Sequence, residues 1–241
     1  MAGGRGLAGE PGRARAVERQ MQNWELARAQ RLSLPVESRP EIEDFVCISR
    51  QAGIDGRQIA EGVAARLGWP LFDREVLDLM AGDDEVRRRL YEAVDERDFK
   101  WWEAAMSPWV VGRFVQDDYF HRLCEAVLML ARQGRCVFLG RGAHRILPAG
   151  QGLRVRLRAG LAGRARALAA ARQLTLAEAR ETLESEERGR AEFFRRRFRT
   201  DLDDPAGYDL VLDLDRWAES EVVELILGAH ALRGRRTNSP G

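Results

Sequence analysis

Short apolar runs alternate with stretches of helical spacing along most of the chain. The runs at residues 45–48, 69–72, 136–139 and 208–214 have the length and composition of buried strands. Residues 153–158 instead alternate between apolar residues and arginine, which predicts a strand with one polar face, either near a sheet edge or facing a polar cleft. Strands of this kind separated by helices predict an α/β fold, an open parallel sheet of about five strands with helices on both faces.

Helices are predicted between these strands from apolar residues three and four positions apart. In the helix that ends at Gly68, the apolar positions are Ile59, Val63, Ala64 and Leu67. Thr175 and Glu178 have the spacing of a capping box, so a long helix is expected to start after Thr175. The other helices are expected at about residues 74–80, 115–133, 162–173 and 218–232, with the long one at 176–199.

The ends and one internal segment differ from this pattern. Residues 1–40 are expected to form a disordered tail and an amphipathic helix at 14–32, which packs on the domain or on a partner, including a second copy of the chain. The domain itself is expected at 41–232, with a disordered tail at 233–241. Residues 83–120 are dense in charged and aromatic residues, which indicates an inserted lobe with a small core of its own.

Composition and charge exclude several classes of function. The chain has 241 residues, 45% of them hydrophobic, and a net charge of +1, as expected for one globular domain without a nucleic-acid or membrane partner. Of its 39 basic residues only Lys100 is a lysine, so the other 38 are arginines. A Schiff-base enzyme, or a phosphate loop of the usual lysine type, would therefore have to use Lys100. Arginine can still bind phosphate.

The cysteines and histidines indicate neither a disulfide framework nor a metal site. The three cysteines are far apart in sequence and are expected in the core of a protein from a reducing cytoplasm. His121, His144 and His230 do not have metal-ligand spacing. No apolar run reaches the length of a membrane span, and the amino end lacks the apolar stretch of a signal peptide.

The turn after the first predicted strand is the first candidate for chemistry. A turn between a parallel strand and a helix presents backbone N–H groups and the positive end of the helix dipole to an anion. Gly56 and Arg57 match the G-K pair of the phosphate-loop pattern G-x-x-x-x-G-K-S/T, but Gln51 replaces its first glycine and Gln58 its serine or threonine. The alternative is a tight turn whose glycines only allow the helix and the strand to pack.

Five segments in chain order give this turn a context: residues 48–59, 62–76, 138–143, 187–195 and 204–210. They resemble, in the same order, the motifs of the cytidylate kinase-like family, a branch of the nucleoside monophosphate kinases that commonly lacks the lysine. The resemblance covers about residues 45–227. It implies a fold of the P-loop kinase type, in which residues 83–120 form the acceptor-binding insert and residues 175–205 an arginine-rich lid.

The resemblance also implies a role for each site residue. ATP phosphates would lie on Gly53, Asp55, Gly56, Arg57 and Gln58. Arg57 is also expected to be catalytic, because it could bind two phosphate oxygens with its planar fork. Asp55 departs from the family, which has glycine there, and its carboxylate would repel a polyphosphate unless Arg50, Arg57 or magnesium compensates. The residues expected to bind the acceptor nucleotide are Asp73, Arg141 and Arg190.

Each of these assignments has a plainer alternative. Arg141 follows an apolar strand at the edge where parallel sheets bind ligands, but it could equally form a surface salt bridge. Asp73 could orient the acceptor or a magnesium-bound water, or only cap a helix. Arg188 and Arg195 are the expected catalytic arginines of the lid, and they share a helix face with Arg199. The alternatives there are a solvated charged face among glutamates and an RNA-contacting patch.

The sequence thus predicts ATP-dependent phosphoryl transfer to a nucleoside monophosphate, which the family resemblance suggests is CMP or dCMP. Magnesium would be carried by the nucleotide phosphates, and no protein ligand is assigned to it. The alternative is a nucleotide-binding regulatory module that has lost catalysis, and the departures at Gln51, Asp55 and Gln58 support it.

Overall fold

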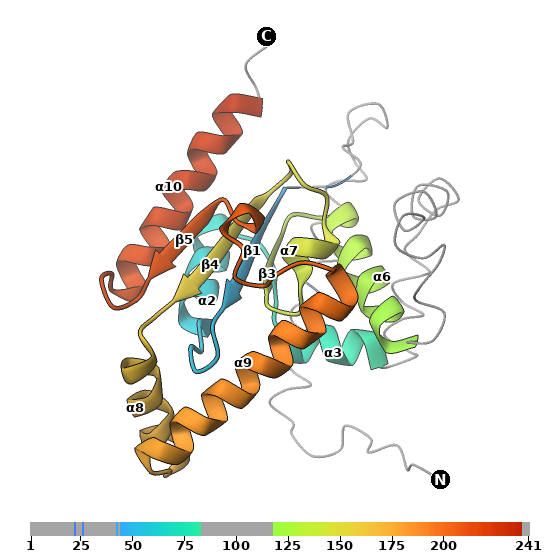
Figure 1. Ribbon diagram of the computed structural model, residues 1–241. Helices are drawn as coiled ribbons and strands as arrows, with labels where there is room; N and C mark the ends of the chain where they lie inside the picture. Colours follow the sequence, from blue (N-terminus) through green and yellow to red (C-terminus); the bar gives the residue numbers. More distant parts are fainter. Residues whose placement is uncertain (1–21, 23–25, 27–41, 43, 83–117, 238–241) are drawn as a thin grey trace. The chain divides into compact units, whose positions relative to one another are not determined.

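The computed structural model describes residues 22, 26, 42, 44–82 and 118–237 (Figure 1). The predictions of an amino-terminal tail and helix, and nearly all of the aromatic insert, lie outside this part of the chain. The chain divides into two compact units, one made of residues 1–43 and 75–135 and the other of residues 44–74 and 136–241. Each unit is described separately below.

The second unit contains a parallel sheet of five strands, which confirms the predicted fold class. In order across the sheet the strands are β2 (Leu71–Phe72), β3 (Cys136–Leu139), β1 (Phe45–Arg50), β4 (Leu153–Arg158) and β5 (Leu210–Asp213). The central strand β1 therefore has β3 on one side and β4 on the other. The turns after β1 and β3 meet at the carboxyl edge of the sheet, where open α/β folds bind ligands.

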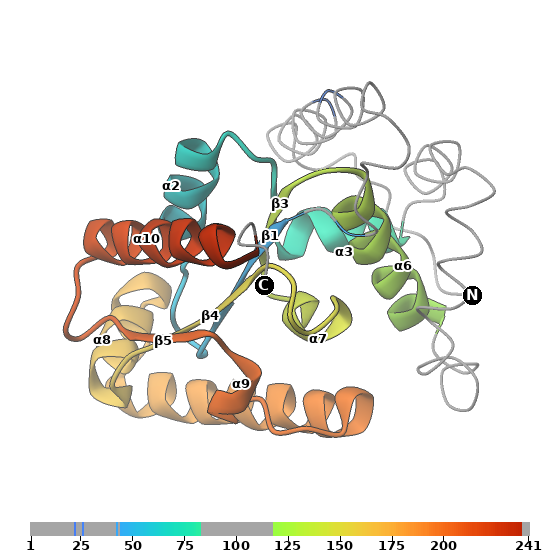
Figure 2. The same ribbon diagram turned by 90° about the horizontal axis from the view of Figure 1, so that it is seen from above.

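One face of the sheet is covered by α2 (Arg57–Leu67) and α10 (Glu219–Thr237) (Figure 2). Their apolar residues form one core with the strands, in which Ile59, Val63, Val222 and Ile226 are completely buried. Gly62 allows this packing, because a Cβ there would lie 3.0 Å from the side chain of Val223. The sequence predicted that α10 would end at residue 232. The helix instead continues to Thr237, so residues 233–237 are helical and do not belong to a tail.

The opposite face carries α7 (Ala143–Ile146) and a hairpin of two helices, α8 (Leu161–Arg172) and α9 (Leu176–Phe198) (Figure 2). The hairpin has a small core of its own, and Ala52 of the turn after β1 belongs to that core. The long helix α9 begins where the capping box predicted, since Thr175 accepts from the Glu178 backbone N–H and Glu178 accepts from the Thr175 N–H. The short elements α7 and η2 (Pro205–Gly207) were not predicted.

The alternating strand β4 is an interior strand next to the edge strand β5, so it lies near a sheet edge but not at it. Its arginines Arg154 and Arg156 are both buried. The guanidinium of Arg154 donates to the backbone carbonyls of His144 at 2.9 Å, Leu147 at 3.2 Å and Gln151 at 3.3 Å, and also to that of Pro148. Arg154 therefore holds the turn between α7 and β4 together, whereas Arg156 faces a polar cleft.

The first unit contains α3 (Arg74–Gly82), except its first residue, and α6 (Asp118–Gln133). Tyr119 of α6 donates a hydrogen bond to the carboxylate of Asp78 on α3. Cys124 of this unit, like Cys47 and Cys136 of the sheet, is a buried free thiol, so the expectation that the cysteines are core residues is confirmed. In the part of the chain described, no helix is long and apolar enough to cross a membrane.

Candidate active site

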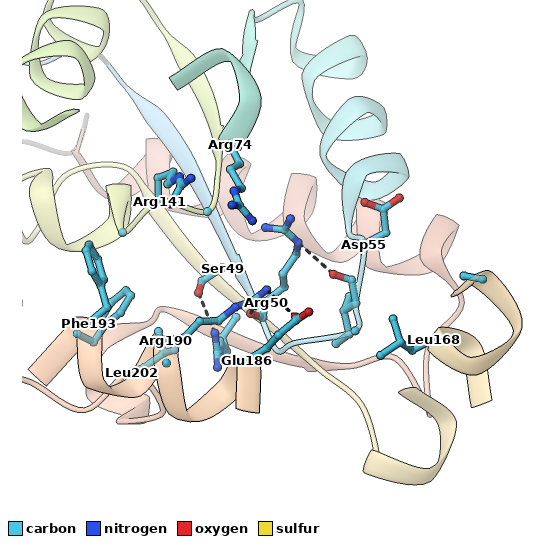
Figure 3. Close-up of a pocket in the computed structure, with 18 of the residues that line it drawn as sticks. Ser49, Arg50, Asp55, Arg74, Arg141, Leu168, Glu186, Arg190, Phe193 and Leu202 are labelled. Atoms are coloured by element: carbon cyan, nitrogen blue, oxygen red, sulfur yellow. Dashed lines mark hydrogen bonds and ion pairs between the residues drawn. The ribbon is translucent and has the colours of Figure 1, made fainter. Parts of the chain in front are cut away.

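A cavity of about 770 Å³ lies at the carboxyl ends of β1, β3 and β4, a size typical of small-molecule sites (Figure 3). The turn after β1, the turn after β3 and one side of α9 form much of its wall. Its charged lining consists of two carboxylates, Asp55 and Glu186, and six arginines, namely Arg50, Arg74, Arg141, Arg156, Arg172 and Arg190. The excess of arginine gives the lining a formal charge of +4, which favours a strongly anionic ligand.

The turn after β1 is shaped by two glycines in the left-handed region. Gly53 has φ 79°, and a Cβ there would lie 2.6 Å from the side chain of Leu183 on α9. Gly56 has φ 64° and is the N-cap of α2, with no side chain capping the helix. The N-cap of α2 therefore has no side chain, which leaves room for an anion beside the N–H groups of the first helical turn.

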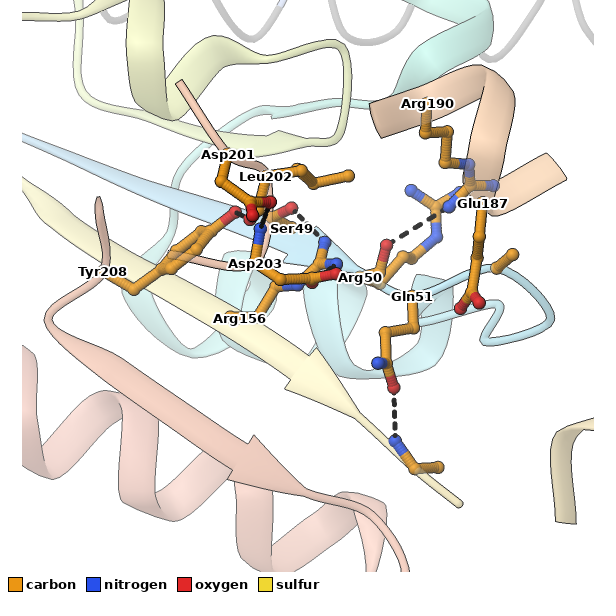
Figure 4. A network of polar contacts seen from close by, with 12 residues as sticks. Ser49, Arg50, Gln51, Arg156, Glu187, Arg190, Asp201, Leu202, Asp203 and Tyr208 are labelled. Atoms are coloured by element: carbon orange, nitrogen blue, oxygen red, sulfur yellow. Dashed lines mark hydrogen bonds and ion pairs between the residues drawn. The ribbon is translucent and has the colours of Figure 1, made fainter. Parts of the chain in front are cut away.

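Gln51, which replaces the first glycine of the phosphate-loop pattern, connects this turn to β4. Its backbone N–H donates to the Leu157 carbonyl at 3.1 Å, and its side-chain oxygen accepts from the Ala159 N–H at 3.0 Å (Figure 4). The glutamine is therefore a structural crosslink between two strand ends. Its presence does not by itself argue against phosphate binding by the turn.

Arg50 lies between the two turns of the site. Its Nε donates to the Ile54 carbonyl at 3.0 Å, and its Nη1 would lie 3.0 Å from a Cβ at Gly140. Burial lowers the pKa of Arg50, and the neighbouring Arg190 and Arg74 lower it further, against the opposing effect of Asp55. Arginine stays charged under these conditions. The fold thus holds like charges close together, an arrangement that a bound anion would stabilise.

The turn after β3 directs Arg141 into the cavity through an unusual backbone. Gly140, Arg141 and Gly142 have φ values of 86°, 51° and 73°, so three consecutive residues are left-handed. A left-handed arginine costs on the order of 1 kcal/mol, and strain of this kind gathers at functional sites. Packing fixes the turn on one side, because a Cβ at Gly142 would lie 2.9 Å from the ring of Phe198.

Arg156 reaches the cavity from the middle of the sheet. Its Nη1 donates to Ser49 Oγ at 2.9 Å, and its Nη2 pairs with Asp203 Oδ1 at 2.5 Å (Figure 4). Its guanidinium carbon also lies 5.9 Å from the ring centre of Tyr208. Because only 5% of Arg156 is exposed, its orientation is set by these contacts.

Helix α9 is fastened to the turn after β1 by two arginines. Arg164 of α8 donates from Nη1 to both the Ala52 carbonyl at 2.8 Å and Glu187 Oε1 of α9 at 2.6 Å. Arg190 of α9 donates to the Arg50 carbonyl at 3.2 Å. Burial lowers the pKa of Arg190, although the neighbouring Glu186 raises it. Glu186, Arg190 and Phe193 thus form the side of α9 that faces the cavity.

The structure brings together only part of the predicted site. Gly53, Asp55, Arg141 and Arg190 line the cavity, whereas Gly56, Arg57, Gln58 and Asp73 are not among its lining residues. Arg57 is half exposed and pairs with Glu61 at 2.9 Å and with Asp73 at 3.2 Å.

The lid arginines predicted to be catalytic lie elsewhere on α9. Arg188 and Arg195 are exposed and do not line the cavity, and Arg188 lies 3.8 Å from Glu184. The face that they share with Arg199 is therefore not the one turned to the cavity.

Four cavity arginines were missed as site residues: Arg50, Arg74, Arg156 and Arg172. Arg50 and Arg74 are within the motifs that carry the family resemblance, Arg50 two residues after the predicted strand 45–48 and Arg74 beside Asp73. Arg156 belongs to the alternating strand, where the polar-cleft interpretation could have identified it. Metal-binding side chains do not form groups of three or more in the part of the chain described.

The fold is of the P-loop kinase-like type, with a parallel sheet of this order and a glycine turn at a helix N-terminus. With its arginine-lined cavity beside a helical hairpin, the protein is a kinase-like phosphotransferase. Residues 45–216 match the model of the cytidylate kinase-like family, so the chain belongs to that family. Its substrates are accordingly nucleotides, and ATP is the nucleotide that the family implies.

The chain is similar to proteins of known structure. An uncharacterized protein from Eubacterium ventriosum ATCC 27560 is 17% identical with a TM-score of 0.63, over 78% of this chain and 98% of that one. A gluconokinase from Sinorhizobium meliloti 1021 is 16% identical with a TM-score of 0.45, over 83% and 97% of the two chains. The first similarity supports the fold alone, and the TM-score of the second is too low to support any conclusion. No curated protein sequence matches the chain significantly.

Proposed function

We propose that the protein transfers the terminal phosphoryl group of ATP to a nucleoside monophosphate, CMP or dCMP. The arginine-rich lining of the cavity carries this proposal. Six arginines and two carboxylates leave a formal charge of +4. A magnesium-bound triphosphate and a phosphate monoester together carry about four negative charges. The cavity thus balances one donor and one acceptor, and the choice of cytidine rests on the family alone.

The donor end of the site is the turn after β1 with the start of α2. Gly53, Gly56 and the backbone of Arg57 and Gln58 would cradle the ATP phosphates at the helix N-terminus. The Arg57 side chain is half exposed and paired with two carboxylates, so exchanging one of them for a phosphate oxygen costs little.

The acceptor end is formed by Arg141, Arg156 and Arg190. They come from the turn after β3, from β4 and from α9, so three separate elements converge on one phosphate. Arg50 lies between the two turns, where its charge would stabilise the phosphoryl group in transit. The catalytic roles of Arg188 and Arg195 stay predictions, and they require α9 to turn or move.

Magnesium fits this site as an ion carried by phosphates. Asp55 is the cavity carboxylate that we assign to hold it, because the Asp55 charge would otherwise oppose the polyphosphate. When bound, the ion neutralises phosphate charge and orients the oxygens. Positioning and charge neutralisation by the arginines then account for most of the catalysis.

Turnover of each nucleoside monophosphate with ATP and magnesium, measured by ADP release, tests the proposal. We expect CMP and dCMP to be the best acceptors. Arg190→Gln should lower kcat about a hundredfold or more, because it removes one of the positive charges that stabilise the reacting phosphates. Arg196→Gln, on the exposed side of the same helix, is the matched control and should keep the wild-type rate.

Two results would contradict the proposal. One is an unchanged rate in Arg190→Gln. The other is the absence of turnover with any monophosphate while ATP still raises the melting temperature, which would identify a nucleotide-binding module without catalysis.

A further inference from the structure

We propose that Asp203 competes with the acceptor's phosphate for Arg156, and so acts as a built-in carboxylate that a phosphate monoester must displace. The inference rests on the proposed function, since it concerns the acceptor end of the same cavity. It assigns Asp203 a role in setting how tightly phosphate ligands bind. Three observations lead to it.

The first observation is how Arg156 uses its hydrogen-bond donors. One terminal nitrogen is bound to Ser49 inside the protein, and the other to the Asp203 carboxylate. The third nitrogen of the guanidinium, Nε, is buried without a hydrogen-bond partner. Arg156 lines the arginine-rich cavity, and its guanidinium has an unsatisfied donor. It therefore favours a ligand that offers more oxygens than one carboxylate does.

The second observation is the unequal exposure of the two partners. The Arg156 side chain is 6% exposed, whereas the Asp203 side chain is 67% exposed. Losing the ion pair would return Asp203 to water at little cost, because most of its carboxylate is already hydrated. Arg156, by contrast, is nearly buried, so its charge would be poorly compensated unless another anion replaces Asp203. A ligand can therefore easily replace Asp203 on Arg156, but the ion pair does not open easily when no ligand is present.

The third observation is that the backbone around Asp203 is held in place. The Asp203 N–H donates to Asp201 Oδ1 at 2.9 Å, and the Leu202 carbonyl accepts from the Tyr208 hydroxyl at 2.7 Å. Leu202 itself lines the cavity (Figure 3). Exchange then needs only a turn of the Asp203 side chain, and the wall of the cavity stays in place.

The consequence is that only phosphorylated ligands displace Asp203. A phosphate monoester brings nearly two negative charges and displaces the single charge of Asp203. A nucleoside without phosphate brings none and would leave Asp203 on Arg156. Asp203 therefore weakens the binding of every phosphate ligand somewhat and leaves the binding of neutral ligands unchanged.

The experiment measures binding by the full-length protein with calorimetry, using CMP, inorganic phosphate and cytidine as probes. Asp203→Asn should bind CMP and phosphate about fivefold more tightly than the wild type, the effect expected for an ion pair with an exposed partner. Affinity for cytidine should not change. Glu192→Gln, which removes an equally exposed carboxylate from α9, is the control for net charge and should have no such effect.

A double-mutant cycle separates competition for Arg156 from a general effect of charge. The gain from Asp203→Asn should disappear when Arg156→Gln is also present. Weaker or unchanged phosphate binding by Asp203→Asn, or an equal gain in Glu192→Gln, would overturn the inference. Failure of the wild type to bind any nucleoside monophosphate would instead contradict the proposed function, while the inorganic phosphate data would still decide the role of Asp203.

Discussion

At the scale of single residues, arginine supplies all the positive side-chain charge of the cavity lining. The only lysine, Lys100, lies outside the described residues and far along the sequence from the turn at Gly53. The cavity instead collects Arg50, Arg156 and Arg190, each oriented by a backbone carbonyl or a polar side chain. Fixed, planar donors suit a reaction in which positioning provides most of the rate.

The single-residue assignments differ in outcome even within one motif segment. Gly53, Asp55, Arg141 and Arg190 line the cavity, whereas other assigned residues of the same segments, such as Arg57 and Arg188, do not. Arg188 was chosen from an assumed helix face, but a face can be assigned only when the neighbours of the helix are known. Sequence spacing does not give those neighbours, so the orientation of α9 could not be predicted.

His144 is a buried histidine whose protonation the fold opposes, and it carries the first residue-scale prediction. Burial lowers the pKa of His144 to about 3, helped by the charges of Arg145, Arg156 and Arg154. The unfolded chain binds a proton near pH 6.5, so the free energy of unfolding should fall as the pH drops from there toward 3. The loss from this residue is about 2 kcal/mol at pH 5.

Melting temperatures at pH 7 and pH 5 measure this effect. His144→Phe is the comparison, because a phenyl ring can fill the stack between Phe194 and Tyr208, whose ring centres lie 5.6 Å and 4.8 Å from that of His144. The variant should lose less stability than the wild type on acidification. An equal loss in both proteins would show that His144 is not the group that titrates.

At the scale of elements, local signals were reliable and non-local ones were not. The strands β3 and β4 have the predicted limits, and α9 starts at its predicted capping box. The helix α7 has only four residues, too few for periodicity to reveal. The interior position of β4 depends on its pairing with β1 and β5, which are distant in sequence, so its arginines could not be placed from the strand alone.

The capping box of α9 gives the element-scale prediction. Thr175→Ala removes the side-chain acceptor for the Glu178 N–H and should lower the free energy of unfolding by about 1 kcal/mol. In a chain of this size that corresponds to about 2–4 °C in melting temperature. Ser185→Ala, at an exposed position within the same helix, should leave stability unchanged or raise it slightly. A Thr175→Ala variant as stable as the wild type would show that the cap contributes nothing.

At the scale of the whole molecule, the sheet order explains why the site lies where it does. The central strand β1 pairs with β3 on one side and β4 on the other, so the turns that follow β1 and β3 open at one edge. Alternation of strands and helices predicted a parallel sheet, and the motif order placed the phosphate-binding turn after its first strand. The choice of acceptor base is assigned to residues 83–120, most of which lie outside the described residues, so that assignment stays a prediction.

Transfer of labelled phosphate from [γ-³²P]ATP to CMP, in one turnover with the protein in excess, tests the central claim most directly. We expect the label to appear in CDP, to depend on magnesium, and to transfer at least a hundredfold more slowly with Arg190→Gln. Label that appears only as inorganic phosphate, or that remains in ATP with CMP and every other nucleoside monophosphate, would contradict the account.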